Sequence, residues 1–214
     1  MLLCTLSDVK TLLKITDDSQ DDTLTLLIKQ QSALISAYIG FNLAMDEYTD
    51  ELQAVNNQQL IPLNNRPIQS VSKVLLNGVE VDDWKLLPQY ASIGFLYRGA
   101  GWCGSMFTRG MTYDIVSGAY DISITYKAGW YLPDDEHYRE GALDSLPYDI
   151  SAACIEAVLE RYNILTAGAE GIKAHSEGGI STTFEGSEAS GSGSGGLSRK
   201  VAAMLEKYRV IGVA

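Results

Sequence analysis

Cysteine, histidine and long apolar runs are all scarce in this chain of 214 residues. Its three cysteines, Cys4, Cys103 and Cys154, lie far apart and show no CxxC spacing. Scattered cysteines in odd number argue against a disulfide scaffold and indicate reduced thiols in a protein made in a cytoplasm. No apolar run approaches the roughly 20 residues of a membrane span. Residues 1–4 are too short, and lack the basic start, for a secretory signal. We therefore expect no membrane partner.

Basic residues are also in short supply. The chain has 16 Lys and Arg against 27 Asp and Glu, and its formal net charge is −11. A protein that grips DNA neutralises phosphates with Lys and Arg, so tight nucleic-acid binding by the isolated chain is not expected. Acidity keeps a protein soluble, and it also suits a surface that must not adhere to DNA. The composition leaves both interpretations open.

The motifs of common catalytic and nucleotide-binding sites are missing. The sequence has no GxxxxGK[ST] loop and no GxSxG elbow. Cys154 falls on the apolar stripe of a predicted helix, where a core role explains it better than a nucleophilic one. Residues 134–137 (DDEH) are ligand types for a metal, but adjacent positions converge on one ion only in a special loop, so a solvated acidic turn is favoured. We predict no catalytic residue, metal or cofactor, and hence no enzyme.

What the chain does contain is a set of amphipathic helices. The strongest pattern runs from Ser145 to Leu165, where apolar residues recur at helical spacing, and Ser145 and Pro147 suit its first turn. The acidic turn at residues 17–22 is expected to cap the helix that follows it. The apolar spacing predicts four helices, at residues 6–15, 22–39, 147–164 and 197–208.

The middle of the chain has a two-residue period instead. Its runs are rich in β-branched and aromatic residues, and the cleanest alternation is at residues 120–126. Asn77-Gly78 predicts a tight hairpin turn, and residues 84–87 and 93–97 are expected to form further strands. The three tryptophans, Trp84, Trp102 and Trp130, could form a sugar or base platform, but in a β-rich region they are more often core or subunit-contact residues.

Residues 167–196 form a long Gly/Ser-rich stretch that precedes the last helix. Such a segment buries too little apolar surface to offset an ordering entropy of about 1–2 kcal/mol per residue. We expect it to be mobile in the free protein and to order only against a binding partner. Ile180 and Phe184 would face one way if this stretch added a strand to a partner's edge. These two residues and Tyr208 are the candidate partner contacts.

The predicted fold class is therefore α+β. A small bundle of about four helices is expected from residues 1–46 and 131–214, with the mobile loop 167–196 before its last helix. Residues 47–130 are expected to form a separate β-rich insertion.

The order of these parts resembles a known family. A two-helix start ending in YIG is followed by LIPLNNRPIQSVSKVLLNGVEV, ITYKAGW, LPYDISAACIEAVLERY and a terminal LEKYR. In this order the segments resemble the head–tail connector (adaptor) proteins of tailed bacteriophages. The resemblance spans most of the chain and misses mainly residues 99–118 and 167–196. It implies a helical bundle with a β insertion, assembled as a twelve-fold ring around the DNA exit channel.

By the same resemblance, the chain is expected to be a structural subunit that docks under the portal, extends the DNA channel and provides the tail attachment surface. Its implied partners are other copies of itself in a dodecameric ring, the portal protein, and tail or neck completion proteins, while genomic DNA passes through without specific binding. The implied location is the head–tail neck of the virion, after assembly in the host cytoplasm. The alternative that the residues leave open is a soluble module that binds carbohydrate or protein through its β lobe.

Overall fold

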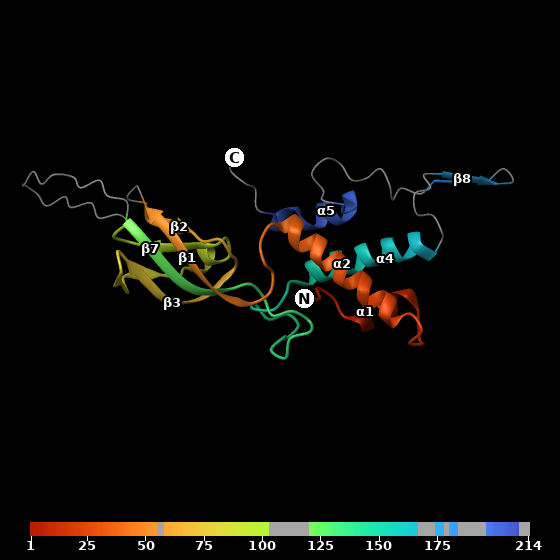
Figure 1. Cartoon of the computed structure of the whole chain (residues 1–214), viewed down its shortest axis with the longest axis horizontal. Coiled ribbons are helices and arrows are strands. Elements are labelled where there is room, and N and C mark those ends of the chain that lie inside the picture. Colours follow the sequence, from red (N-terminus) through yellow and green to blue (C-terminus); the bar gives the residue numbers. More distant parts are fainter. Residues whose placement is uncertain (55–57, 103–119, 167–173, 178–179, 184–195, 210–214) are drawn as a thin grey trace, which may run out of the picture. The chain divides into compact units, whose positions relative to one another are not determined.

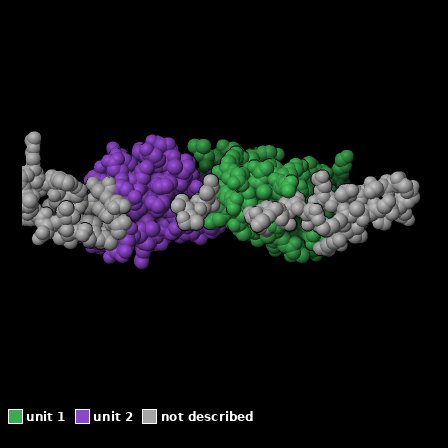
Figure 2. Space-filling model, turned by 90° about the horizontal axis from the view of Figure 1, so that it is seen from above, with its two compact units in different colours: residues 1–41, 131–214 green, residues 42–130 purple. Residues whose placement is uncertain are grey.

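The computed structural model describes residues 1–54, 58–102, 120–166, 174–177, 180–183 and 196–209. The chain divides into two compact units, coloured separately in Figure 2. Unit 1 comprises residues 1–41 and 131–214, and unit 2 comprises residues 42–130. Helices and antiparallel sheets are both present, which confirms the α+β class. None of the described helices is long and apolar enough to cross a membrane.

Unit 1 is built from helices (Figure 1). They are α1 (Leu6–Leu13), α2 (Asp21–Ile39), α4 (Tyr148–Thr166) and α5 (Arg199–Leu205), which a 3₁₀ turn, η2 (Glu206–Tyr208), continues. Each lies where the apolar spacing predicts a helix, with ends that differ by one or two residues. Gly40 ends α2 in a left-handed conformation, as a C-terminal glycine does.

The core of unit 1 forms where α2 packs against α4 (Figure 1). Ile28 and Ile35 of α2, and Ile150, Cys154 and Val158 of α4, are at most 1% exposed. These positions recur at helical spacing, so each helix buries one stripe against the other. Burial of side chains of this size is worth about 1.5–3 kcal/mol each. The interpretation of Cys154 as a core residue is confirmed.

The acidic turn before α2 does not cap that helix with a side chain, so this prediction is wrong. The N-cap residue is Gln20, which makes no side-chain capping bond. Asp17 instead accepts hydrogen bonds from the backbone N–H and hydroxyl of Ser19, at 3.0 and 2.5 Å. Asp18 and Asp21 pair with the Lys10 ammonium of α1, at 2.9 and 2.7 Å. The turn therefore binds α1 to α2.

Unit 2 contains two antiparallel sheets and a short helix, α3 (Pro88–Ala91). The four-stranded sheet has the order β1 (Asp46–Ala54), β7 (Tyr120–Ala128), β3 (Ile68–Leu76), β4 (Val79–Glu80). The three-stranded sheet has the order β2 (Leu60–Pro62), β6 (Phe95–Arg98), β5 (Trp84–Lys85).

The core of unit 2 is organised on β7. Ile122, Ile124 and Tyr126 are at most 2% exposed and alternate with more accessible residues, as the two-residue period predicts. Trp102 is fully buried in the same core, and Trp130 is 8% exposed. These two tryptophans are therefore core residues and form no surface platform.

Tight turns in unit 2 depend on residues with positive φ. Asn77 and Gly78, at φ 49° and 78°, connect β3 to β4, which confirms the predicted hairpin turn. Gly129, at φ 104°, lies against the chain where it enters unit 2, and a Cβ there would meet the Ala44 carbonyl oxygen at 2.4 Å. Only glycine fits this close approach.

Several elements of unit 2 differ from the sequence-based expectation: α3 was not predicted, and the strand expected at residues 93–97 is β6, Phe95–Arg98. β1 was not predicted, because its segment DEYTDELQA is rich in acids, which have low strand propensity. Its register with β7 runs along the whole strand, and this pairing overrides the propensity. The strand predicted at residues 84–87 stops at Lys85, because Pro88 occupies the first turn of α3 and favours a helix start.

The Gly/Ser-rich stretch contains a described hairpin, β8 (Ala174–Glu177) and β9 (Ile180–Thr183). Ile180 pairs with Glu177 of the same chain. The strand that was expected to need a partner's edge is therefore paired within the chain. The expectation of mobility for 167–196 concerns residues that mostly lie outside the described ones.

Candidate interaction surfaces

A loop at residues 133–147, here called the acidic loop, leads into α4 (Figure 1). Its ends are bound to each other: the Tyr131 N–H donates to the Asp144 carbonyl at 2.8 Å, and the Leu146 N–H donates to the Tyr131 carbonyl at 2.9 Å. Leu132 and Leu146 are buried at its base, at 5% and 3% exposure. The loop is therefore an anchored part of unit 1.

Ser145 stabilises this loop and does not cap α4, so the prediction for its hydroxyl is wrong. The buried Ser145 hydroxyl accepts a hydrogen bond from the Arg139 N–H at 3.0 Å. The Arg139 guanidinium in turn donates to the carbonyl oxygens of Glu136 and Tyr138, at 2.9 and 2.7 Å. The Ser145 hydroxyl, which was expected to cap the helix, therefore closes the loop instead.

Leu143 projects from the acidic loop and is 97% exposed. Two consecutive turns hold its backbone. The Ala142 N–H donates to the Arg139 carbonyl at 3.0 Å, with Gly141 at φ 80°, and the Ser145 N–H donates to the Ala142 carbonyl at 3.2 Å. Exposing a leucine side chain to water is unfavourable. Because the backbone of Leu143 is already fixed, little further conformational entropy is lost when a partner covers it.

The acidic loop exposes five carboxylates, and Asp144 adjoins Leu143 in the sequence: Asp134, Asp135, Glu136, Glu140 and Asp144. The His137 backbone N–H donates to the Asp135 carboxylate at 2.8 Å, and this bond, with the nearby imidazole, holds the pKa of Asp135 below its usual value. Within the described part of the chain, no group of three or more His, Cys, Asp or Glu is placed to hold a metal ion. The DDEH segment is a solvated acidic turn.

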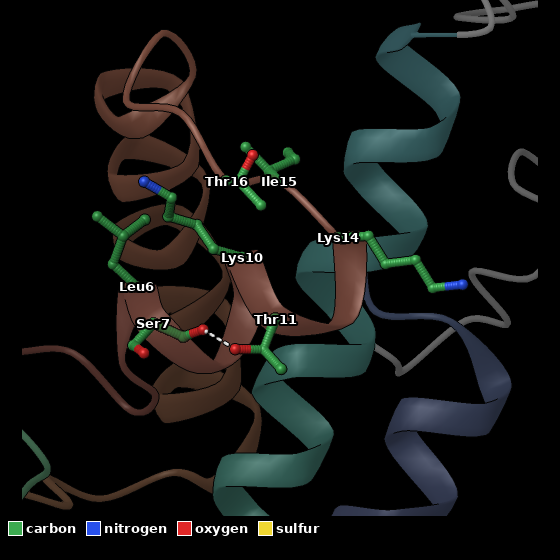
Figure 3. Close-up of a pocket in the computed structure, with 7 residues that line it drawn as sticks. All are labelled: Leu6, Ser7, Lys10, Thr11, Lys14, Ile15 and Thr16. Atoms are coloured by element: carbon green, nitrogen blue, oxygen red, sulfur yellow. Dashed lines mark hydrogen bonds between the residues drawn. The ribbon is translucent and has the colours of Figure 1, made fainter.

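A second feature of unit 1 is an open hollow of about 520 Å³ on α1 (Figure 3). Leu6 and Ile15 contribute its aliphatic side chains, Lys10 and Lys14 its charges, and three hydroxyl side chains the rest. The Thr11 hydroxyl donates back to the Ser7 carbonyl at 2.8 Å, within the helix. We call this feature the α1 hollow.

The two lysines of the α1 hollow differ in their pairing. Lys10 is held by Asp18 and Asp21, and the hydrogen bonds to these carboxylates raise its pKa. Lys14 lies in a left-handed conformation at the end of α1, is exposed, and has no ion-pair partner among the described residues. In Figure 3 its side chain points away from Lys10. One positive charge at this hollow is therefore available to an incoming carboxylate.

Tyr208, a predicted partner contact, makes contacts within its own unit. Its hydroxyl donates to the Asp149 carboxylate of α4 at 2.7 Å, and the other oxygen of that carboxylate pairs with Lys207. Burial and the bond to Asp149 raise the pKa of Tyr208 to about 12. Burial alone would raise the pKa of Asp149, but Lys207 and Tyr208 lower it overall. Tyr208 thus joins the C-terminal turn to α4, and a further contact with a partner stays a prediction.

The described part of the structure does not place the other two predicted contacts beside Tyr208. Ile180 begins β9, and Phe184 lies outside the described residues. Sequence reasoning missed both Leu143 and the α1 hollow. The only signal for Leu143 is a single leucine within the polar segment EGALDS. For the hollow it is the four-residue spacing of Leu6 and Lys10, which places them on one face of α1.

Comparison with known proteins gives one family and a shared fold. The family model described as "Head completion protein" matches residues 2–159. No curated protein is similar enough to count as a match. A solved chain from the neck of an empty GTA particle, computed with C6 symmetry, is 16% identical, with 99% of this chain and 92% of that chain covered and a TM-score of 0.50. A second, from the neck of a native GTA particle computed with C12 symmetry, is 17% identical, with coverages of 90% and 84% and a TM-score of 0.44.

Proposed function

The chain belongs to the head completion protein family, and from this premise we propose that it is a structural subunit of a ring in the neck of a tailed phage or phage-like particle. Family membership confirms the resemblance to head–tail connector proteins that the sequence motifs carry. In the proposed role the ring docks under the portal, extends the DNA channel and offers a surface to the tail. The family match over residues 2–159 is the observation that carries this proposal.

Three properties of the molecule support it. The fold is shared with a chain from the neck of a GTA particle. The net charge of −11 would leave a ring weakly adhesive to the DNA that passes through it. The buried Cys4 and Cys154 form no disulfide, and the Cys4 thiol donates a hydrogen bond to the Cys154 sulfur at 3.6 Å, which suits assembly in a reducing cytoplasm.

The test is assembly on the portal. The full chain is mixed with purified portal rings, and the complexes are weighed by native mass spectrometry and imaged by electron microscopy. We expect the portal to gain a ring layer that contains several copies of the chain. A portal that gains no copies, with a chain that remains monomeric at every concentration, would reject the proposed function. The alternative binding module predicts that second result, together with a monomer that binds a glycan or peptide.

A further inference from the structure

We propose that Leu143 of one subunit inserts into the α1 hollow of the next copy of this chain, so that the acidic loop and α1 form a head-to-tail contact around the ring. This inference rests on the proposed ring, and adds to it the residues that join neighbouring subunits. The two surfaces are different patches of unit 1. Contacts between different patches are heterologous, and they close into rings when the rotation between subunits allows it.

Shape and polarity favour this pairing. Leu143 is 97% exposed at the corner of a hydrogen-bonded turn, so it is a preformed projection. The hollow of about 520 Å³ has aliphatic side chains, Leu6 and Ile15, and is large enough for a leucine and part of its turn. Insertion would remove apolar surface of both partners from water.

Charge supports the same occupant. Leu143 is followed in the acidic loop by Asp144, whose side chain is exposed. The hollow offers Lys14, which has no ion-pair partner within the described ranges. A second copy of the chain therefore supplies both the leucine and the complementary charge. Such charges steer and orient association more than they add affinity.

A subunit does not fill its own hollow. The acidic loop and the turn after α1 lie at different ends of unit 1 in Figure 1. The hollow of each copy is thus free for the next.

Cysteine trapping tests the contact directly. Leu143→Cys and Ser7→Cys are introduced together, in a Cys103→Ser background, and the full chain is oxidised with diamide at concentrations that give rings. A heterologous contact joins each subunit to two neighbours, so we expect a ladder of dimers, trimers and larger multiples. Either cysteine alone should give no species beyond a dimer. The pair Leu26→Cys and Ser7→Cys is the matched control, because Leu26 is an exposed leucine of unit 1 outside the acidic loop, at 55% exposure.

Substitution gives an independent measure. Leu143→Ser should weaken subunit association about ten- to a hundredfold, the loss expected for one buried leucine side chain, and Leu26→Ser should have little effect. Lys14→Glu and Asp144→Lys should each weaken association, and the double variant should regain part of it. Rings that form without a ladder, and tolerate Leu143→Ser, would overturn this inference and leave the proposed function standing. Absence of any ring, with or without the portal, would overturn both.

Discussion

Unit 1 and unit 2 differ in how completely they bury their own apolar side chains. Among the described residues, unit 2 exposes two large apolar side chains, Val79 and Ile93, at 66% and 50%. The large apolar side chains that unit 1 exposes are more numerous: Met1, Leu12, Leu26, Leu143, Tyr148 and Leu165. Contiguous exposed apolar surface marks interaction sites, whereas single exposed apolar residues are normal on a protein surface. The subunit contact proposed above uses one of these side chains of unit 1, Leu143.

The units also differ in their buried polar groups. In unit 2, the Asp50 carboxylate is 6% exposed and accepts hydrogen bonds from the Tyr126 hydroxyl and the Asn64 N–H, both at 2.8 Å. In unit 1, the fully buried Ser32 hydroxyl accepts a bond from the Leu3 N–H at 3.1 Å and lies 3.6 Å from the Cys154 sulfur. Unit 2 thus fixes its loops with a charged network, and unit 1 holds its N-terminal segment with weaker, neutral contacts.

The largest expected effect concerns the segment before α5. Deletion of residues 170–196 should abolish assembly on the portal, because this Gly/Ser-rich stretch is predicted to dock on a neighbouring subunit or the portal. The helical circular dichroism of unit 1 and its thermal unfolding should stay close to those of the intact chain, since its core residues lie outside the deletion. Electron microscopy of portal mixtures measures the first effect.

A length-preserving variant sharpens this prediction. Ile180→Ser combined with Phe184→Ser removes the two apolar side chains and keeps the linker. If the apolar contacts matter, this variant should also fail to assemble, whereas normal assembly of the deletion variant would reject the docking role of the whole segment.

The core of unit 1 should respond next most strongly. Val158 is fully buried in α4, and Val158→Ala should lower the free energy of unfolding by about 1–3 kcal/mol, because methyl groups and their contacts are lost. Chemical denaturation followed by helical circular dichroism measures it. Leu165→Ala on the same helix, where the residue is 39% exposed, should cost much less. Equal effects of the two substitutions on the free energy of unfolding would contradict the burial of Val158 in the core of unit 1.

The polar network of unit 2 should show a smaller effect. Tyr126→Phe removes the donor to Asp50 and should cost about 1–2 kcal/mol, because the buried carboxylate keeps only part of its hydrogen bonding. Tryptophan fluorescence reports on this unit through the buried Trp102. Tyr48→Phe is the control, since the Tyr48 hydroxyl accepts its bond from Asn42 at an exposed site. If the Tyr126→Phe and Tyr48→Phe variants were equally stable, the hydrogen bond from Tyr126 to Asp50 would not stabilise unit 2.

The sequence predicted the helices well and the surfaces poorly, for physical reasons. Ile150, Cys154 and Val158 recur every four residues, which is the spacing of a helix that buries one face, so the sequence predicted α4. β1 was missed because its stability comes from pairing with a distant strand, β7. Leu143 and Ser145 depend on a closed loop whose hydrogen bonds join residues that no helical or strand period links. Exposure of a leucine follows from such a loop, and residue type alone does not indicate it.

The smallest effect concerns the C-terminal turn of unit 1. The pKa of Tyr208 is raised to about 12 from an ordinary value of 10.0, so its contribution is complete below pH 10.0 and is lost as the pH rises toward 12. The pKa of Asp149 is lowered from 3.8, so its contribution is present above that value and is lost as the pH falls below it. Tyr208→Phe should therefore cost about 0.5–1 kcal/mol at neutral pH.

The pH dependence separates the two partners. In Tyr208→Phe, the unfolding temperature should fall less between pH 10 and pH 12 than in the intact chain, because this phenol no longer titrates. The loss of stability at acid pH should remain, because it comes from the Asp149–Lys207 pair. Asp149→Asn should weaken both declines. If the unfolding temperature of Tyr208→Phe changed with alkaline pH as it does in the intact chain, the hydroxyl of Tyr208 would not stabilise the fold through Asp149.

The central claim, that this chain is a ring subunit of the neck, is tested most directly by imaging particles made with and without it. Cryo-electron microscopy of the neck should show, in the complete particle, a ring between portal and tail into which the folds of unit 1 and unit 2 fit. Particles made without the chain should lack that ring and carry no attached tail. A neck that is identical in both preparations, with tails attached in both, would contradict the account.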